Sequence, residues 1–215
     1  RRGRFNGESF TGVHQGIHFL RSLEFAKGMP QRGRVVVIGG GNTALDCARS
    51  SLRLGAKPVI YYRRTEEEMP AFPDEVREAR EEGVEFVFQA APSEIWGHEQ
   101  RVAGVRFLRT RPGEPDTKGR RSVVMIEGSE FEVEAETVLL ALGEEVDEAP
   151  LEGVMPPRER FFAGGDLTGA GTVSAAIGQG RRAAADIEKF LTGSTDILVD
   201  LPAARSARPE VVAPE

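Results

Sequence analysis

The stretch Val35–Asp46, "VVVIGGGNTALD", joins a short apolar run to three consecutive glycines and the start of a helix-like pattern. The continuous β-branched run predicts a strand covered on both faces in a parallel sheet. Apolar residues recur at helical spacing from Asn42 to Leu54, and Gly55 predicts the end of that helix. Val59 to Tyr62 supplies a second strand. Residues 34–62 therefore predict one strand, helix, strand unit with a right-handed crossover.

The glycines form the pattern G-x-G-x-x-A at Gly39, Gly41 and Ala44. Gly39 lets the chain leave the strand in a turn that a side chain would block, and Gly41 lets the backbone approach a pyrophosphate. Ala44 keeps the helix close to the sheet, so that the N–H groups of the first helical turn face the anion. The alternative is a turn that merely joins a strand to a helix, but the flanking strands favour a nucleotide site.

The end of the second strand distinguishes the two nicotinamide cofactors. An NAD site usually carries Asp or Glu there to bind the ribose hydroxyls, whereas this chain reads Tyr62-Arg63-Arg64-Thr65. Two guanidinium groups cannot accept a hydrogen bond from a hydroxyl, but they can bind a 2′-phosphate bidentately. Arg63 and Arg64 therefore predict NADP(H), with surface pairing to Glu66–Glu68 as the alternative.

Composition limits the classes of partner and site. The 215 residues are 40% hydrophobic, and 28 Lys and Arg stand against 34 Asp and Glu, which gives a net charge of −6. These charges are mixed along the chain, which argues against a nucleic-acid partner. The only cysteine, Cys47, excludes an internal disulfide and a cysteine-based metal site, and its place on a helix predicts a core residue rather than a nucleophile. No apolar stretch is long enough to span a bilayer, so we expect a soluble, cytoplasmic protein.

The rest of the chain alternates between helical and strand-rich patterns. Helices are predicted from Val13 to about Gly28, over 73–82 and up to Leu191, and strands between Val84 and Leu142 and at Phe161–Ala163. These patterns divide the chain into four segments, at 1–31, 32–145, 146–191 and 192–215, of which the last is a tail without periodicity.

A second glycine-rich stretch lies at Phe161–Leu191, "FFAGGDLTGAGTVSAAIGQGRRAAADIEKFL". Asp166 stands in the turn, and Gly169, Gly171 and Thr172 open a long helix of small residues. The start of such a helix would stabilise negative charge, such as that of a reduced flavin, while Asp166 could accept from a polyol hydroxyl. Taken alone, this stretch would be interpreted as an ordinary turn before a helix, with Asp166 as one of the turn residues.

The order of the motifs is more specific than each motif. "VIGGGNTALDCAR", "YYRRTEEEMPAFPDEVREAREEGVEF", "LLALG" and "AGGD…TVSAAIGQGRRAA" follow one another at characteristic distances. Together they resemble the flavin- and NADPH-binding part of the glutamate synthase small subunit family, from about Gly12 to Leu191. The same module is similar to parts of dihydropyrimidine dehydrogenase and, more distantly, of adrenodoxin reductase.

This resemblance implies an α/β fold in which a Rossmann-like NAD(P)-binding domain is inserted into an FAD-binding domain, incomplete in this chain. It implies that residues 1–31 are a flavin-domain linker and helix, that 32–145 are the NADPH-binding domain, and that 146–191 are the C-terminal segment of the FAD-binding domain, followed by the tail at 192–215. It implies that hydride passes from NADPH to FAD and that electrons pass on to an iron–sulfur partner subunit or domain. The chemistry belongs to the cofactors, so no side chain is assigned a catalytic role. The residues implied are Gly39, Gly41, Asn42, Thr43 and Ala44 for the NADPH pyrophosphate, Arg63 and Arg64 for the 2′-phosphate, Gly143 where the two domains rejoin, and Gly165, Asp166, Thr172 and Val173 for FAD.

This chain departs from the family pattern in one respect. The family has a further G-x-G-x-x-G motif for FAD, and usually a cysteine-rich iron–sulfur domain, N-terminal to everything seen here. We therefore expect the chain to bind NADP(H) but to hold FAD weakly unless a partner or a missing N-terminal region completes the site. A non-catalytic NADP(H)-binding module is the alternative. A dehydrogenase of the Tyr-x-x-x-Lys type is disfavoured, because Tyr61 and Tyr62 are followed four residues on by Thr65 and Glu66.

Overall fold

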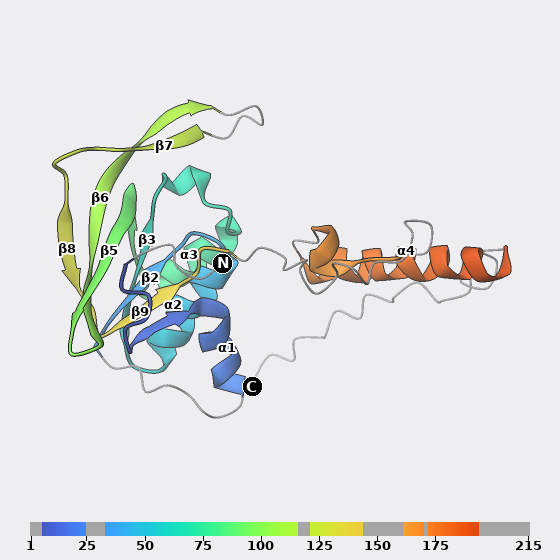
Figure 1. Cartoon of the computed structure of the whole chain (residues 1–215), viewed down its shortest axis with the longest axis horizontal. Coiled ribbons are helices and arrows are strands. Elements are labelled where there is room, and N and C mark those ends of the chain that lie inside the picture. Colours follow the sequence, from blue (N-terminus) through green and yellow to red (C-terminus); the bar gives the residue numbers. More distant parts are fainter. Residues whose placement is uncertain (1–5, 25–32, 116–120, 144–160, 170–171, 194–215) are drawn as a thin grey trace, which may run out of the picture. The chain divides into compact units, whose positions relative to one another are not determined.

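The computed structural model describes residues 6–24, 33–115, 121–143, 161–169 and 172–193 (Figure 1). The chain divides into two compact units, unit 1 from Arg1 to Glu144 and unit 2 from Glu145 to Glu215. This division falls one residue from the predicted boundary at residue 145. The predicted tail at 192–215 lies almost entirely outside the described residues.

A parallel sheet forms the centre of unit 1. Its five strands lie in the order β1 (Val13–Gln15), β9 (Thr137–Leu140), β2 (Arg34–Ile38), β3 (Lys57–Tyr62) and β4 (Glu85–Phe88). Strands β2 and β3 pair in parallel from Arg34 beside Lys57 to Ile38 beside Tyr61. Helix α2 (Asn42–Arg53) connects them, which confirms the predicted strand, helix, strand unit.

A second, antiparallel sheet is built around one long strand. Strand β6 (Arg101–Pro115) pairs with β5 (Ala90–His98), and also with β8 (Phe131–Glu134) and β7 (Arg121–Met125). The first part of β6 pairs with both β5 and β8, and its pairing with β5 ends where Arg109 lies beside Ala90, the first residue of β5. From Thr110, which lies beside Met125, β6 pairs with β7. The sheet therefore extends beyond the end of β5.

Alternate residues of β2 face two different cores, as expected for a strand covered on both sides. Val35 and Val37 belong to a cluster with α1 (Gly16–Glu24), α2 and α3 (Pro73–Glu81). Val36 and Ile38 belong to a second cluster, with residues of β5, β6 and β9. Unit 1 thus has three layers, with helices on one face of the parallel sheet and the antiparallel sheet on the other (Figure 1).

The N-terminal residues differ from expectation. The helix predicted from Val13 is wrong in its first turn, because Val13–Gln15 form β1 and pair in parallel with Val138–Leu140 of β9. A strand of three residues is too short to show a period, so the helical spacing of Val13 with Ile17 was misleading. Because β1 extends the central sheet, residue 31 is not a boundary between compact units. The assignment of residues 1–31 to a flavin domain stays a prediction.

Other differences concern strands. Phe161–Ala163 form no strand, so that prediction is wrong. Strands β5 and β8 were not separately predicted. Pro92 and Gly97 stand inside β5, at places where its pairing with β6 shifts, and such residues obscure the alternation that marks a strand.

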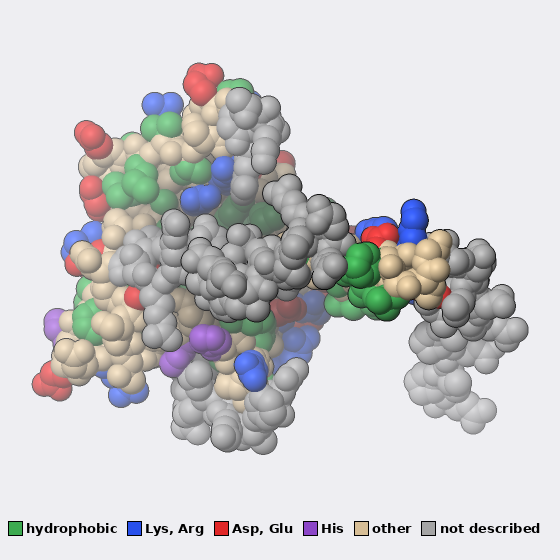
Figure 2. All heavy atoms as spheres, turned by 45° about the vertical axis from the view of Figure 1, so that its right-hand side comes forward, with side chains coloured by type: hydrophobic (Ala, Val, Ile, Leu, Met, Phe, Trp, Pro, Cys, Tyr) green, Lys and Arg blue, Asp and Glu red, His purple; other side chains and the backbone are tan. Residues whose placement is uncertain are grey.

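Unit 2 contains one long helix, α4 (Val173–Thr192), which follows a 3-10 turn at Gly165–Thr168. Thr172 caps α4 by accepting a hydrogen bond from the Ala175 N–H at 3.2 Å, and Gly193 ends it in the left-handed conformation. None of the described residues of α4 is buried. Figure 2 shows hydrophobic side chains (green) on its surface, and Val173, Ile177, Phe190 and Leu191 are among those exposed. Among the described helices, none has the length and apolar character needed to cross a membrane.

Candidate functional site at the first glycine turn

The turn after β2 is shaped by close approaches of the backbone. A Cβ atom on Gly39 would lie 2.2 Å from the carbonyl oxygen of Ala141, and the φ of Gly39 is 148°. The Gly39 N–H donates to the Tyr61 carbonyl at 3.1 Å, so the turn leaves the sheet between β3 and β9. The close approach of the Ala141 carbonyl shows that a side chain at Gly39 would be blocked.

The next two glycines serve different needs. A Cβ on Gly40 would lie 2.4 Å from the ring of Tyr62, so this position also excludes a side chain. Around Gly41 the space is open, and the nearest atom to a Cβ there is the Cγ of Pro70 at 4.0 Å. No protein atom excludes a side chain at Gly41. A glycine at this position, at the start of a helix, leaves room for a ligand to approach the backbone.

Helix α2 begins directly at this turn. The Ala44 and Leu45 N–H groups donate to the Gly41 carbonyl at 2.9 and 3.3 Å. Gly41 is the N-cap and brings no side chain to the N–H groups that precede Ala44. Ala44 itself is fully buried against the sheet, as predicted. The helix start can therefore bind an anion through its backbone and its dipole.

The loop after β3 is fastened to the turn. The Ala71 N–H donates to the Gly40 carbonyl at 3.2 Å, and the Phe72 N–H donates to Oδ1 of Asn42 at 3.0 Å. The hydroxyl of Tyr62 donates to the Glu68 carbonyl at 2.8 Å. The Oδ1 atom of Asn42 thus accepts the hydrogen bond that holds the loop, and the NH2 group of the same amide takes no part in this contact.

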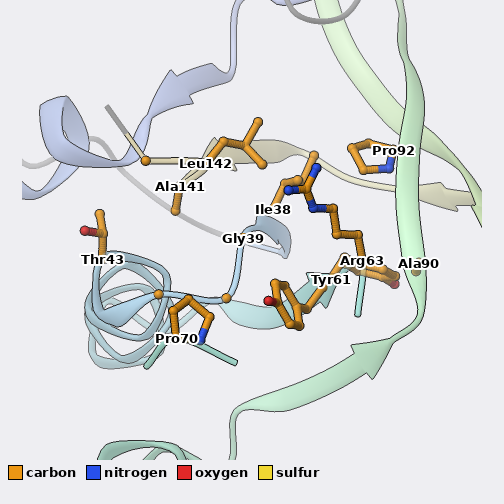
Figure 3. A pocket seen from close by; sticks show the side chains of 14 residues that line it. Ile38, Gly39, Thr43, Tyr61, Arg63, Pro70, Ala90, Pro92, Ala141 and Leu142 are labelled. Carbon is orange, nitrogen blue, oxygen red and sulfur yellow. The ribbon is translucent and has the colours of Figure 1, made fainter. Parts of the chain in front are cut away.

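A cavity of about 230 Å³ opens at the turn (Figure 3). Thr43, at the start of α2, and Arg63, after β3, lie on opposite sides of it, with Gly39 between them (Figure 3). The lining joins the ends of three parallel strands to the start of β5: Ile38, Gly39, Gly40, Gly41, Thr43, Tyr61, Tyr62, Arg63, Pro70, Ala90, Pro92, Ala141, Leu142 and Gly143. In open α/β sheets, ligands bind at this carboxyl edge of the strands.

The two arginines differ in their surroundings. Arg63 is exposed and lines the cavity, and in the view of Figure 3 its side chain extends from the end of β3 toward Ile38. The Arg64 side chain is only 9% exposed, and its Nη1 lies 3.8 Å from Oε1 of Glu68. The ion pairing that the sequence left open as an alternative is therefore present for Arg64, with Glu68. The structure places Arg63, and not Arg64, in the cavity lining.

Two titratable side chains near the turn are neutral parts of the core. Tyr61 stacks on Phe107 with 4.3 Å between ring centroids, and burial, assisted by Glu85, raises the pKa of its hydroxyl. Cys47 is buried in α2, as predicted, and burial together with the nearby Asp46 raises the pKa of its thiol to about 12. A thiol with that pKa is protonated at neutral pH and is no nucleophile.

The residue predicted at the junction of the two domains lies in unit 1, and the residues predicted for FAD lie in unit 2. Gly143, with a φ of 81°, lies in unit 1 at the cavity. In unit 2, Gln179 of α4 accepts from the Gly165 N–H at 2.8 Å and from the Thr168 hydroxyl at 2.7 Å, which fastens the second turn to its helix. Thr172 is used as the N-cap, and Val173 is 78% exposed. Asp166 belongs to the 3-10 turn.

Several lining residues were missed by the sequence interpretation. Gly40 belongs to the glycine run in the sequence, but the G-x-G-x-x-A pattern does not indicate that the ring of Tyr62 leaves no room for a side chain there. Pro70, Ala90 and Pro92 come from loops and strands that meet the turn only in the folded chain: Ala71 bonds to Gly40, and β5 covers the same face of the sheet as Tyr61. A tertiary contact of this kind leaves no periodic signal in the sequence.

Comparison with known families gives a match over most of the chain. The model of the pyridine nucleotide-disulphide oxidoreductases matches residues 4–180. Among curated proteins, the glutamate synthase [NADPH] small chain of Escherichia coli is 43% identical over 226 residues, which cover 88% of this chain and 48% of the relative. The NADP(+)-dependent formate dehydrogenase subunit beta of Moorella thermoacetica is 39% identical over 207 residues, covering 87% of this chain and 29% of the relative. The chain therefore spans less than half of each of these relatives.

Solved structures share the fold. The Mycobacterium tuberculosis FprA complex with NADPH gives a TM-score of 0.69 at 18% identity and covers 90% of this chain and 62% of that one. The thioredoxin reductase of Lactococcus lactis gives a TM-score of 0.57 at 20% identity, with coverage of 89% and 62%. At these identities the likeness concerns the fold alone.

Proposed function

This chain belongs to the pyridine nucleotide-disulphide oxidoreductase family, and we propose that its unit 1 is the NADP(H)-binding part of an FAD-dependent oxidoreductase. The observation that carries the proposal is the cavity between the glycine turn and Arg63. Its position at the carboxyl edge of the parallel sheet, its glycine turn at a helix start and the arginine in its lining support binding of a dinucleotide with an additional phosphate.

The pyrophosphate would lie over Gly41 at the start of α2. Gly41 has open space above it, whereas Gly39 and Gly40 are confined by protein atoms. The backbone N–H groups of Asn42 and Thr43 and the Thr43 hydroxyl can donate to phosphate oxygens there, and Ala44 holds the helix against the sheet. Because these donors are backbone groups and the helix dipole, the site needs no basic side chain for the pyrophosphate.

The 2′-phosphate would bind at the end of β3. Arg63 lines the cavity and reaches along its wall, so we propose it as the main phosphate ligand. Arg64 remains a proposed second ligand, but its ion pair with Glu68 would have to be given up or shared for it to contribute. The order of importance is therefore Arg63 before Arg64.

When bound, NADPH would supply a hydride to the flavin, and the flavin would pass electrons on. The relatives named above include subunits of larger enzymes, and we propose likewise that this chain transfers electrons to an iron–sulfur partner subunit or domain. We propose no catalytic role for a side chain, because the chemistry belongs to the cofactors. The role of unit 1 is to bind and orient the nicotinamide nucleotide.

Gly165, Asp166, Thr172 and Val173 are proposed as part of the FAD site, and Gly143 is proposed to lie where the NADPH domain rejoins the FAD domain. Only the C-terminal segment of an FAD domain is proposed here, because the chain spans less than half of its curated relatives. The remainder of that site would come from outside these residues. We expect the isolated chain to bind NADPH while holding FAD weakly.

The test is calorimetric titration of the chain with NADPH and with NADH, after recording the visible spectrum for bound flavin. Replacing Arg63 by Gln should weaken NADPH binding roughly tenfold or more and leave NADH binding nearly unchanged, because a charge-assisted contact to the 2′-phosphate is lost. Arg64→Gln should have a smaller effect. Arg77→Gln, an exposed arginine on α3 that pairs with Asp74, is the matched control.

Three results would count against parts of this proposal. Equal losses of NADPH and NADH affinity in Arg63→Gln would show that Arg63 does not recognise the 2′-phosphate. Tight NADPH binding without reduction of a dye, even with added FAD and the purified partner, would favour a non-catalytic nucleotide-binding module. Stoichiometric flavin in the isolated chain would mean that the FAD site is complete without further segments.

A further inference from the structure

The peptide backbone of the two arginines is held by one residue of the antiparallel sheet and by one residue that joins the two sheets. The hydroxyl of Thr110, in β6, donates to the Arg63 carbonyl at 2.7 Å. The N–H of Gln89, between β4 and β5, donates to the Arg64 carbonyl at 3.0 Å. Both carbonyl groups that follow β3 are thus fixed by hydrogen bonds from residues distant in sequence.

Gln89 and Thr110 are also bonded to each other. The Thr110 N–H donates to the Gln89 carbonyl at 2.9 Å, and Nε2 of Gln89 donates to the Thr110 carbonyl at 3.3 Å. We call this pair the Gln89–Thr110 clasp. Thr110 is buried, with 4% of its surface exposed, so its hydroxyl has little access to water as a substitute partner.

The backbone of Gln89 is in an unusual conformation. Its φ is 54°, in the left-handed region that residues with a side chain rarely adopt. Such a conformation persists only where the surroundings hold it, and it is most often found at functional positions. Here it turns the Gln89 N–H toward Arg64 and its carbonyl toward Thr110, so one residue joins both sides of the clasp.

The clasp stands where the two sheets meet. β3 ends at Tyr62, immediately before the arginines, and β4 ends at Phe88, immediately before Gln89. Thr110 directly follows Arg109, the last residue of β6 that pairs with β5, and it lies beside Met125 of β7. The parallel sheet therefore presents the arginines, and the antiparallel sheet determines where their backbone lies.

We propose that Gln89 and Thr110 are positioning residues for NADP(H) selectivity, an inference that rests on the proposed function above. Arg63 has a long, flexible side chain, and a bidentate contact with a phosphate requires that its Cα be held in place. The clasp fixes the carbonyl that follows that Cα. Neither clasp residue is proposed to contact the nucleotide. Their effect should therefore appear in recognition of the 2′-phosphate and not in binding of the rest of the ligand.

The experiment compares adenosine 2′,5′-bisphosphate with adenosine 5′-monophosphate by calorimetry on the 215-residue chain. The ratio of the two affinities isolates recognition of the 2′-phosphate. Thr110→Val keeps the shape of the side chain but removes the hydroxyl, and it should lower that ratio roughly three- to tenfold, as expected for one lost hydrogen bond. The affinity for the monophosphate should change little. Thr110→Ser, which retains the hydroxyl, should keep most of the ratio.

Two further variants complete the design. Gln89→Gly accepts a φ of 54° without strain but loses the side-chain bond to Thr110, so it should fold and still lower the ratio. It provides the test if Thr110→Val does not fold. Ser22→Ala removes a hydroxyl that donates to the Phe19 carbonyl at 2.6 Å in α1, away from the cavity, and should leave the ratio unchanged even where the melting temperature falls.

The outcomes separate the two proposals. If Arg63→Gln abolishes the preference for the bisphosphate while Thr110→Val and Gln89→Gly keep it, the clasp has only a structural role and the inference is overturned. If Arg63→Gln leaves the preference unchanged, the proposed 2′-phosphate site is itself wrong. Equal losses for both ligands in Thr110→Val, without recovery in Thr110→Ser, would also overturn the positioning role.

Discussion

The two glycine-rich turns of this chain look alike in sequence and differ in structure. In the first, Gly39 is confined by the Ala141 carbonyl, and the helix that follows, α2, buries Leu45, Cys47 and other residues. In the second, a Cβ on Gly165 would meet no atom within 4 Å, and none of the described residues of α4 is buried. Gly39 is required by its neighbours, whereas Gly165 is favoured only by its φ of 73°.

The difference shows that a glycine-rich turn forms a binding cavity only where neighbouring strands and loops pack around it. The first turn has β3, β9 and the loop at Ala71 against it, and these create the cavity. Within the described residues, the second turn is fastened only to its own helix, through Gln179. This agrees with the proposal that the FAD site needs a further segment or chain, and four predictions can sharpen or break the comparison.

The largest contrast should come from one apolar residue on each helix. Leu45 of α2 is 1% exposed and Ile177 of α4 is 57% exposed. Leu45→Ala should lower the free energy of unfolding by about 3 kcal/mol, and Ile177→Ala by less than about 0.5 kcal/mol. Urea unfolding followed by fluorescence of Trp96 and by circular dichroism would measure both. Similar losses in the two variants would mean that α4 is covered in solution.

The glycines themselves give the second contrast. Gly39→Ala places a Cβ against the Ala141 carbonyl and should cost about 3 kcal/mol of stability as well as NADPH binding. Gly165→Ala meets open space and should cost only about 1 kcal/mol, for the left-handed conformation. Thermal unfolding and NADPH titration of both variants test this. A tolerated Gly39→Ala would contradict the close approach of β9.

The third prediction concerns Cys47 and alkaline pH. The folded chain keeps this thiol protonated because its pKa is raised from 9.0 to about 12. The unfolded chain loses the proton near pH 9, so stability is fully present below that pH and falls as pH rises toward 12. At pH 10.5 the loss from this group should be about 2 kcal/mol. Urea unfolding from pH 8 to 10.5 should therefore show a shallower decline in Cys47→Ala than in the parent chain. Identical slopes would show that the thiol is not buried.

The smallest effect is expected at the cap of α4. Thr172→Ala removes the oxygen that accepts from the Ala175 N–H and should weaken the start of the helix by about 1 kcal/mol. Hydrogen exchange of the first α4 amides should quicken roughly fivefold, with Thr172→Ser as the control that retains the hydroxyl. Exchange in α2 should not change. A change in α2 as well would show that the two units stabilise each other.

The sequence by itself determined the local features of the nucleotide-binding unit. The β-branched run at 35–38, the G-x-G-x-x-A pattern and the apolar period of 42–54 predict the strand, turn and helix that β2, Gly39–Gly41 and α2 form. These signals are legible because each depends on neighbours within one turn or one strand. The same locality explains the failures: three residues of β1 show no period, and Phe161–Ala163 carry an apolar pattern without a strand partner among the described residues.

Only the tertiary structure decided how the site is enclosed and which arginine faces it. The sequence alone does not distinguish Arg63 from Arg64. In the structure the backbone after β3 directs the Arg63 side chain to the cavity and the Arg64 side chain to Glu68. The bonds that hold this backbone come from Gln89 and Thr110, which are 26 and 47 residues beyond Arg63. Contacts at that separation depend on how two sheets meet, and no local pattern of residues encodes that meeting.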